Sequence, residues 1–375
     1  MAQPKLFTPI QVGRLTLAHR VVMPPLERLR STADHIPNAL MAEYYAQRAS
    51  TPGTLLIAEA TMPAPRAAGY RHGAGVWSDE QVQGWRVVTD GVHARGSYIF
   101  QQLWAPGRLA QLDVLEEQGL PYVSASDVKL SDCPKAPRPL TIEEIKEYVK
   151  SFGDGARNSM RAGFDGVELH AANGYLVDQF LQDVTNHRTD EYGGSIENRC
   201  RFALEIIQAM VDAVGDEAKV GFRCSPWGSF GEVGMEDPKP TFAYLVTQLR
   251  DRFPSLAYIH VIEPRINGDG LDRSVDKGES NDFLREIWKP RPFISAGGYT
   301  ERELALEAAE RTGDLIAAGR LFISNPDLPL RWQLNVPAKK GDRSAYYTYE
   351  SPKGYVDYPF MNGEVQPERF KPVSA

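Results

Sequence analysis

Residues 166–181 read GVELHAANGYLVDQFL, a short strand-like run followed closely by a helix-like segment. The run GVELH predicts a strand, and the polar residues His170, Asn173 and Tyr175 lie at or just beyond its end. Strands that are mostly apolar and short are typical of parallel sheets covered on both faces by helices. This stretch therefore predicts one β/α unit with hydrogen-bonding side chains at the end of the strand.

The same β/α unit recurs along the chain. We predict strands at residues 20–25, 53–61, 97–104, 166–170, 219–226, 257–264, 292–298 and 314–320. Eight units predict the α/β class and a (β/α)8 TIM barrel. A doubly wound sheet would need a glycine-rich loop after its first strand, but that strand ends in Pro24 and Pro25, and the sequence contains no GxGxxG.

Helix-like segments separate the strands, for example at residues 36–49 and 196–215. Thr141 with Glu144 and Thr300 with Glu303 each match the capping box that starts a helix. Residues 6–20 predict a hairpin that plugs the N-terminal end of the barrel. The long polar stretch 106–139 predicts an excursion over the C-terminal face, and we take residues 1–375 as one domain.

Composition restricts the function. The chain has 375 residues, of which 42% are hydrophobic, and its formal net charge of −7 argues against a nucleic-acid or membrane partner. The three cysteines are far apart and form no CxxC, so neither a disulfide framework nor a metal site is predicted. The N-terminus lacks the apolar core of a signal peptide, so we expect a cytoplasmic protein, either a monomer or a homodimer.

In a TIM barrel the active site lies at the carboxyl ends of the strands. The last two predicted strands end in Gly297-Gly298 and Gly319-Arg320, a pattern that predicts a phosphate site rather than two ordinary turns. Gln102 and Arg223 should point into the barrel, where a buried amide and guanidinium need polar partners. A phosphate-bearing heterocycle would satisfy all these groups, whereas Glu168 is a purely structural partner for Arg223.

Three residues at the end of the fourth strand suggest chemistry. His170 and Asn173 offer N–H donors that can hold a developing oxyanion. Tyr175 offers a proton to a carbon that gains a hydride beside a carbonyl group. A histidine alone would be a core residue and a tyrosine alone a packed aromatic, but three such groups within six residues favour a catalytic role.

These motifs resemble those of the Old Yellow Enzyme family of flavoproteins, and most closely its fungal and yeast-like members. The resemblance rests on ordered segments over nearly the whole chain: LFTPIQVGRLTLAHRVVMPPLERLR, GTLLIAEAT, FQQLW, HAANGYLVDQFLQDVTNHRTDEYGGSIENRCRF, VGFRCSP, GRLFISNPDLPLR and GYVDYP. It implies an FMN-containing barrel that takes hydride from NADPH or NADH and reduces the C=C bond of a small activated alkene. Chain length and scattered cysteines exclude the two-domain iron–sulfur relatives.

The resemblance also implies residue roles. His170 and Asn173 would hold the substrate oxygen, and Tyr175 would protonate the α-carbon while flavin N5 delivers hydride to the β-carbon. The residues implied to contact FMN are Pro24, Pro25, Leu26, Glu27, Ala60, Gln102, Arg223, Gly297, Gly298, Gly319 and Arg320. Those implied to shape the substrate pocket are Tyr70, Trp104 and Tyr355.

Two positions depart from the family pattern. Glu27 stands where many members have a threonine beside the flavin, and we expect it to be ionised and to face the flavin. The alternatives are a solvent-facing Glu27 paired with Arg28 or Arg30, and a Glu27 protonated through burial that donates to the flavin as the threonine hydroxyl would. The loop at residues 267–280 carries no aromatic residue where members often place one, which predicts a more open or more polar pocket.

Three other functions compete with ene-reduction. An isomerase or desaturase of a fungal biosynthetic pathway would use the same residues on the same flavin. A barrel glycosidase would need a carboxylate at the seventh strand, where Gly297-Gly298 stands. A flavin-storage protein would have no need of Tyr175.

Overall fold

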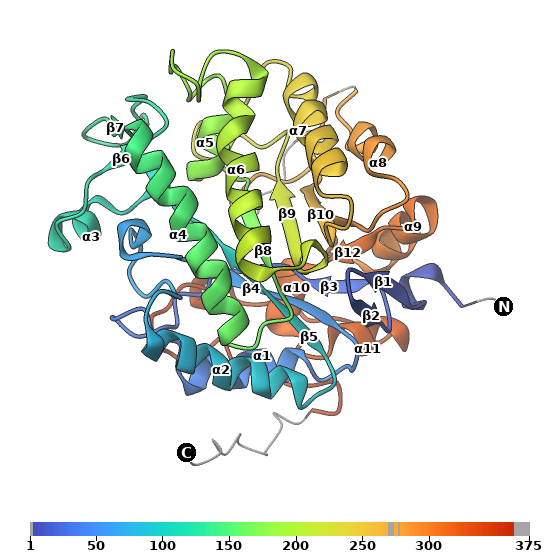
Figure 1. Ribbon diagram of the computed structural model, residues 1–375. Helices are drawn as coiled ribbons and strands as arrows, with labels where there is room; N and C mark the ends of the chain where they lie inside the picture. The colour runs from blue at the N-terminus through green and yellow to red at the C-terminus, as the bar shows by residue number, and fades with distance from the viewer. Residues whose placement is uncertain (1–2, 269–273, 277, 364–375) are drawn as a thin grey trace.

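A closed barrel of eight parallel strands forms the centre of the computed structural model, which describes residues 3–268, 274–276 and 278–363 (Figure 1). The strands are β3 (Val21–Met23), β4 (Leu55–Thr61), β5 (Tyr98–Leu103), β8 (Gly166–Ala171), β9 (Val220–Cys224), β10 (Tyr258–Ile262), β11 (Phe293–Ala296) and β12 (Leu315–Ala317). β12 pairs with β3, which closes the ring. The predicted TIM barrel and its eight strands are confirmed, with every strand inside the predicted range or within one residue of it.

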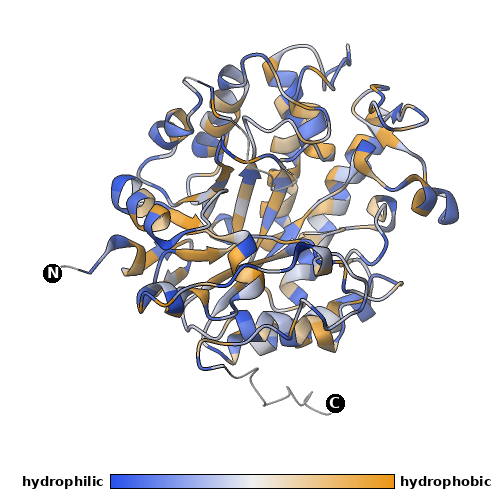
Figure 2. Ribbon diagram, turned by 180° about the vertical axis from the view of Figure 1, so that it is seen from behind, coloured by the Kyte–Doolittle hydropathy of each residue, from blue (hydrophilic) through white to orange (hydrophobic). Residues whose placement is uncertain are grey.

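Helices surround this barrel. They are α1 (Ala39–Arg48), α2 (Asp79–His93), α3 (Leu112–Glu117), α4 (Ile142–Arg161), α5 (Leu176–Leu181), α6 (Ile196–Val214), α7 (Lys239–Arg252), α8 (Asp282–Trp288), α9 (Arg302–Thr312), α10 (Gly319–Ser324) and α11 (Leu328–Gln333). Short 3-10 helices lie at Lys5–Phe7, Pro65–Ala67, Gly107–Leu109, Glu217–Lys219 and Arg343–Ala345. Figure 2 shows apolar strands at the centre and hydrophilic faces on the outer helices. Because helices cover the outer face of the barrel, strands such as β4, β8 and β9 are buried at every residue.

One predicted capping box is confirmed and the other is wrong. The Thr141 hydroxyl accepts from the Glu144 N–H, and the Glu144 carboxylate accepts from the Thr141 N–H, at the start of α4. The N-cap of α9 is Glu301, and no side chain caps it. Thr300 instead donates its backbone N–H to the carbonyl of Gly298 across 2.9 Å. The turn after β11 therefore holds Thr300 one residue before the cap.

The predicted N-terminal hairpin is present as β1 (Ile10–Val12) and β2 (Leu15–Leu17). Val12 and Leu17 are buried against Leu55 and Tyr258, which begin β4 and β10. The hairpin therefore closes the N-terminal end of the barrel. Its tight turn uses Gly13 with φ of +52°, a conformation that glycine adopts without strain.

The stretch 106–139 contains α3 and the two short strands β6 (Val123–Ser124) and β7 (Arg138–Pro139). It contacts segments that follow β8 and β9: the Ser124 hydroxyl donates to Gln179 across 2.8 Å, and Arg108 donates to the carbonyl of Gly231 across 2.6 Å. These contacts place it beside the carboxyl ends of the strands. That residues 1–375 form one domain stays a prediction.

Within the parts of the chain that the structure describes, no helix is long and apolar enough to cross a bilayer. The same residues contain no group of three or more His, Cys, Asp or Glu side chains placed to bind a metal ion.

Candidate active site

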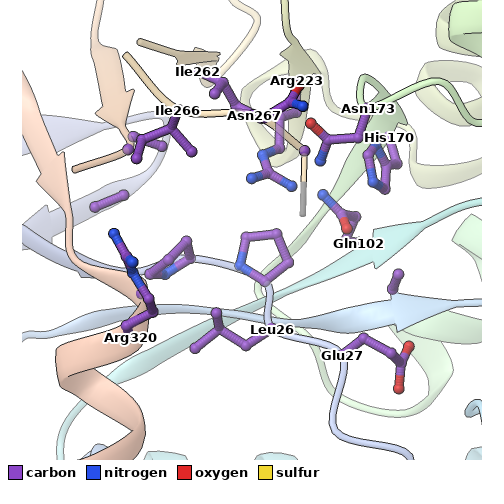
Figure 3. Close-up of a pocket in the computed structure, with 18 of the residues that line it drawn as sticks. Leu26, Glu27, Gln102, His170, Asn173, Arg223, Ile262, Ile266, Asn267 and Arg320 are labelled. Carbon is purple, nitrogen blue, oxygen red and sulfur yellow. The ribbon is translucent and has the colours of Figure 1, made fainter. Parts of the chain in front are cut away.

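A cavity opens at the carboxyl ends of the strands. It is lined by Pro24, Pro25, Leu26, Glu27, Ala60, Gln102, Trp104, His170, Asn173, Tyr175, Arg223, Ile262, Ile266, Asn267, Gly268, Ala296, Gly297, Gly298, Tyr299, Thr300, Ala317, Gly319, Arg320, Ile323, Arg343, Tyr346 and Tyr347. All predicted site residues except Tyr70 and Tyr355 are in this lining. Figure 3 shows His170, Asn173, Arg223 and Gln102 together on one side and Arg320 across the cavity from them.

Buried polar side chains form the floor on the inside of the barrel. Gln102 Nε2 donates to Glu168 Oε1 across 2.7 Å, and His260 Nδ1 lies 2.9 Å from Glu168 Oε2. Both oxygens of Glu168 are thus engaged by side chains of β5 and β10. Among the described residues, no hydrogen bond joins Arg223 to Glu168, so the purely structural pairing considered for Arg223 is wrong, although the Glu168 charge still acts on it at longer range.

Arg223 itself faces the cavity (Figure 3). Its Nε is buried and has no hydrogen-bond partner among the described residues. Burial lowers the pKa of its guanidinium, and the Glu168 charge acts in the opposite direction. A buried cation with an unpaired donor is costly, so this position calls for an acceptor inside the cavity.

The opposite end of the cavity consists of glycine-rich turns. Gly297 and Gly298 have φ values of +112° and +71°, which other residues rarely adopt. At Gly319 a Cβ would lie 3.1 Å from the Leu26 side chain, so the backbone there passes close to the first strand-end loop. Arg320 follows and extends beside these turns (Figure 3). Backbone and a guanidinium together can hold a phosphate.

His170 and Asn173 lie near the floor. The pKa of His170 is well below its usual value, chiefly because the ring is buried and also because Arg223 and His260 are near, so the imidazole is neutral. Its Nδ1 and the Oδ1 of Asn173 have no partner among the described residues. Asn173 adopts φ of +58°, and its backbone N–H donates to Ser225 Oγ across 2.8 Å. That bond fixes the turn that aims the Asn173 amide into the cavity.

Tyr175 is surrounded by aromatic rings. The Trp104 ring meets it edge-on with centroids 4.6 Å apart, and the His170 ring meets it edge-on at 5.1 Å. Phe230 closes a third side at 6.4 Å. Tyr70 is not in the cavity lining, but its ring packs on Trp104 with centroids 5.2 Å apart. Burial and the charges of nearby groups raise the pKa of Tyr175, so it keeps its proton.

The NADH:flavin oxidoreductase / NADH oxidase family model matches residues 5–339. The chain belongs to this family. It is 48% identical over 362 residues to the chanoclavine-I aldehyde reductase fgaOx3 of Penicillium roqueforti, covering 95% of this chain and 96% of the relative. It is 42% identical to a protein of Epichloe festucae var. lolii described as the probable inactive reductase easA, covering both chains fully. The Old Yellow Enzyme of a Pichia species has the same fold, with a TM-score of 0.88, 36% identity and coverage of 98% and 96%.

This flavin oxidoreductase is thus an Old Yellow Enzyme-type reductase, as the sequence predicted, and its cofactors are FMN and a nicotinamide nucleotide. The residues present fit FMN. The unpaired buried donor of Arg223 calls for an acceptor such as a flavin pyrimidine carbonyl, and the glycine turns with Arg320 suit a phosphate at the other end. Bare proline rings and the small Ala60 side chain leave a flat wall between them.

The structure corrects the expectation for Glu27. Its Oε1 accepts from the backbone N–H groups of Arg28 and Leu29, 3.0 Å each, and its Oε2 is buried. Figure 3 shows the carboxyl turned away from Leu26 and Arg320. Burial, and then the nearby Glu59, raise the pKa of Glu27 well above its usual value. The burial and orientation of the carboxyl disagree with the ionised, flavin-facing form and with a solvent-facing pair with an arginine; a protonated Glu27 that donates to the flavin stays a prediction.

Tyr355 is a second correction. Its ring is fully buried and stacks on Tyr44 with centroids 4.0 Å apart. Arg28 and Arg30 lie over the same ring. Tyr355 therefore packs beneath the cavity rather than lining it.

Sequence reasoning missed residues that loops bring to the site. Arg343, Tyr346 and Tyr347 reach the cavity from the C-terminal segment, and Phe230, in the loop after β9, packs beside Tyr175. Phe230 also packs on Gly268, so an aromatic residue does stand near the substrate position, from a different loop than the one considered. Part of the loop at 267–280, residues 269–273 and 277, lies outside the described residues.

Proposed function

We propose that this enzyme reduces the C=C bond of α,β-unsaturated carbonyl or nitro compounds with hydride from NADPH or NADH. The presence of His170, Asn173 and Tyr175 in one cavity whose lining suits FMN carries the proposal: Figure 3 shows His170 beside Asn173, and the Tyr175 ring lies 5.1 Å from that of His170. When bound and reduced, FMN supplies a hydride from N5 to the β-carbon of the alkene. Side chains of the protein carry out the remaining steps, which are binding of the substrate oxygen and donation of a proton.

His170 and Asn173 bind the substrate oxygen. A neutral imidazole offers one N–H and the Asn173 amide offers two. Both side chains have unpaired polar atoms in the described structure, so they can turn these groups to an incoming carbonyl or nitro oxygen without breaking a strong internal bond. Two donors on one oxygen polarise the alkene and stabilise the negative charge that gathers on that oxygen as the β-carbon is reduced.

Tyr175 then protonates the α-carbon. Its raised pKa means that it releases a proton only to a strongly basic atom, which the α-carbon of an enolate is. Trp104, Phe230 and His170 hold the ring on three sides, so the hydroxyl reaches one place in the cavity.

Conjugated aldehydes are a substrate class to test first. The relative fgaOx3 is named as an aldehyde reductase, and the aromatic and aliphatic side chains around the site suit an apolar body behind the reacting carbonyl. NADPH is the expected donor. Cytoplasmic location and a monomeric or homodimeric state stay predictions.

A direct test follows the flavin colour without oxygen. Purified protein should be yellow, NADPH should bleach it, and 2-cyclohexenone or a conjugated aldehyde should restore the colour with formation of the saturated product. Restored colour without a saturated product, or a changed position of the double bond without NADPH, would contradict the proposal. Tyr192→Phe is a matched control, because Tyr192 is a buried tyrosine bonded to Glu205 away from this cavity.

A further inference from the structure

Two carboxyl groups meet behind the loop that follows β3. Glu27 lies in this loop, and Glu59 lies on β4 with no exposed surface. Strands β3 and β4 are paired, and each carboxyl group acts on the pKa of the other. Ionised carboxylates only accept hydrogen bonds, so a bond between two carboxyl groups requires a proton on one of them.

Each of the two carboxyl groups has one oxygen that accepts a hydrogen bond and one that does not. Glu27 Oε1 accepts from Arg28 and Leu29, and Glu59 Oε1 accepts from the Tyr45 hydroxyl across 3.1 Å. The Oε2 atoms of Glu27 and Glu59 are both buried and have no hydrogen-bond partner among the described residues. One proton between these two atoms satisfies both.

The surroundings decide which residue carries the charge. Burial raises the pKa of Glu59 as well, but Glu27, the Tyr45 hydroxyl and the Arg28 and Arg30 guanidinium groups all act against this rise and favour the ionised form. Glu27 has backbone N–H donors on one oxygen only, and the charge of Glu59 disfavours a second charge beside it. Tyr44 and Tyr355 complete the wall around the pair without donating to either Oε2.

The loop that Glu27 holds is under backbone strain. Leu29 has φ of +56°, which is unfavourable for a residue with a side chain. Glu27 Oε1 accepts from the N–H of this residue, and its other oxygen is buried. The same loop supplies Pro24, Pro25 and Leu26 to the cavity.

We propose that Glu27 is a neutral positioning residue, whose carboxylic acid donates to Glu59 and accepts from Arg28 and Leu29, and so fixes the wall of the cavity formed by Pro24, Pro25 and Leu26. The pairing of Glu27 with Glu59 is inferred from residues of this protein and does not depend on a bound flavin. Only its effect on a flavin rests on the proposed function.

Infrared spectroscopy of the flavin-loaded protein tests the shared proton. A protonated carboxyl gives a C=O band that shifts in D2O, and the flavin bands cancel when the spectra of parent and variant are subtracted. Glu27→Gln should remove one such band. Asp178→Asn, which alters another buried carboxyl, should remove a different band and leave the Glu27 band in place. If Glu27→Gln removes only a carboxylate band, Glu27 is ionised and the proposal is wrong.

The flavin midpoint potential and the affinity for FMN distinguish a positioning role of Glu27 from an effect of its charge. Glu27→Gln keeps all three contacts, because its amide donates and its carbonyl accepts, so the potential and FMN content should not change. Glu27→Leu loses all three, and its FMN dissociation constant should rise by about tenfold or more. A raised potential in Glu27→Gln would show a lost negative charge, and unchanged FMN binding in Glu27→Leu would show no positioning role. These readouts need no turnover, so they stay interpretable if ene-reduction is not the activity.

Discussion

Gln102 Nε2 donates to Glu168 Oε1 across 2.7 Å, and this bond fixes the direction of a buried amide. The two residues pair directly in the register of β5 and β8, so the contact follows from the strand alignment. With its N–H group engaged below, Gln102 presents its carbonyl oxygen to the cavity. An acceptor at that place, beside the Arg223 donor, matches the donor and acceptor edge of a flavin pyrimidine ring.

Glu168→Gln should destabilise the protein. The change removes the charge that Arg223 and His260 both sense, and leaves Gln102 free to reverse its amide. We expect the free energy of unfolding to fall by about 1–3 kcal/mol, the usual cost of an unsatisfied buried polar group, together with weaker FMN binding. Denaturant unfolding measures the first effect and flavin titration the second. Glu205→Gln, a half-buried control away from the barrel interior, should leave FMN binding unchanged.

Tyr175→Phe should separate the two half-reactions. Flavin reduction by NADPH should be nearly intact, because it needs no proton from tyrosine. Reoxidation by an enone should slow by roughly 10²–10⁴-fold, the usual contribution of a positioned general acid. Nitroalkenes should be affected less, because their nitronate product is stable without carbon protonation. Stopped-flow absorbance measures each step, and an equal loss in both would exclude Tyr175 as the proton donor.

His170→Ala and Asn173→Ala should each weaken phenolate binding. A phenolate oxygen imitates the charged oxygen of an enolate, and each donor to it should contribute about 1.5–3 kcal/mol. The long-wavelength band of phenolate over oxidised flavin reports binding. His93→Ala, on the surface beside Asp165, is the control. Variants that titrate with phenol like the parent would show that the two residues do not hold the oxygen.

Asp178 should make stability depend on pH. Burial raises its pKa to about 7, whereas an unfolded aspartate titrates near pH ~3.9. Between these values the folded protein binds more protons than the unfolded chain, so stability falls as pH rises from about 4 to about 7. Asp178→Asn cannot ionise. Its stability relative to the parent should therefore rise across this range, by on the order of 4 kcal/mol at most.

Thermal unfolding at a series of pH values measures this difference. Asp132→Asn, at an exposed position, should follow the parent at every pH. A constant difference between Asp178→Asn and the parent from pH 4 to pH 8 would show that Asp178 titrates normally in the folded protein.

The barrel was predictable because its signals are local. Each strand is a short, mostly apolar run that is buried on both faces, so its residues alone identify it. The capping box of Thr141 and Glu144 is complete within four residues. Thr300 has the same spacing to Glu303, yet a backbone bond to Gly298 keeps it outside the helix. Spacing alone cannot reveal a turn that the preceding strand imposes.

The strand-end residues of the site were predictable for the same reason, and the loop residues were not. Tyr346 and Tyr347 reach the cavity because buried arginines bind backbone carbonyls of their segment: Arg28 and Arg30 both donate to the carbonyl of Tyr346. These partners are more than 300 positions apart. The state of Glu27 was the hardest to predict. Burial and the nearby Glu59 raise its pKa, and no nearby sequence signal connects Glu27 with Glu59.

Isotope labelling tests the central claim most directly. NADPH carrying deuterium at nicotinamide C4 is used in ordinary water, and unlabelled NADPH is used in D2O, with a conjugated enone or aldehyde as substrate. The account predicts that deuterium from NADPH appears on the β-carbon and that deuterium from D2O appears on the α-carbon of a saturated product. Deuterium from NADPH at the carbonyl carbon, or a product that keeps its double bond, would contradict ene-reduction by this site.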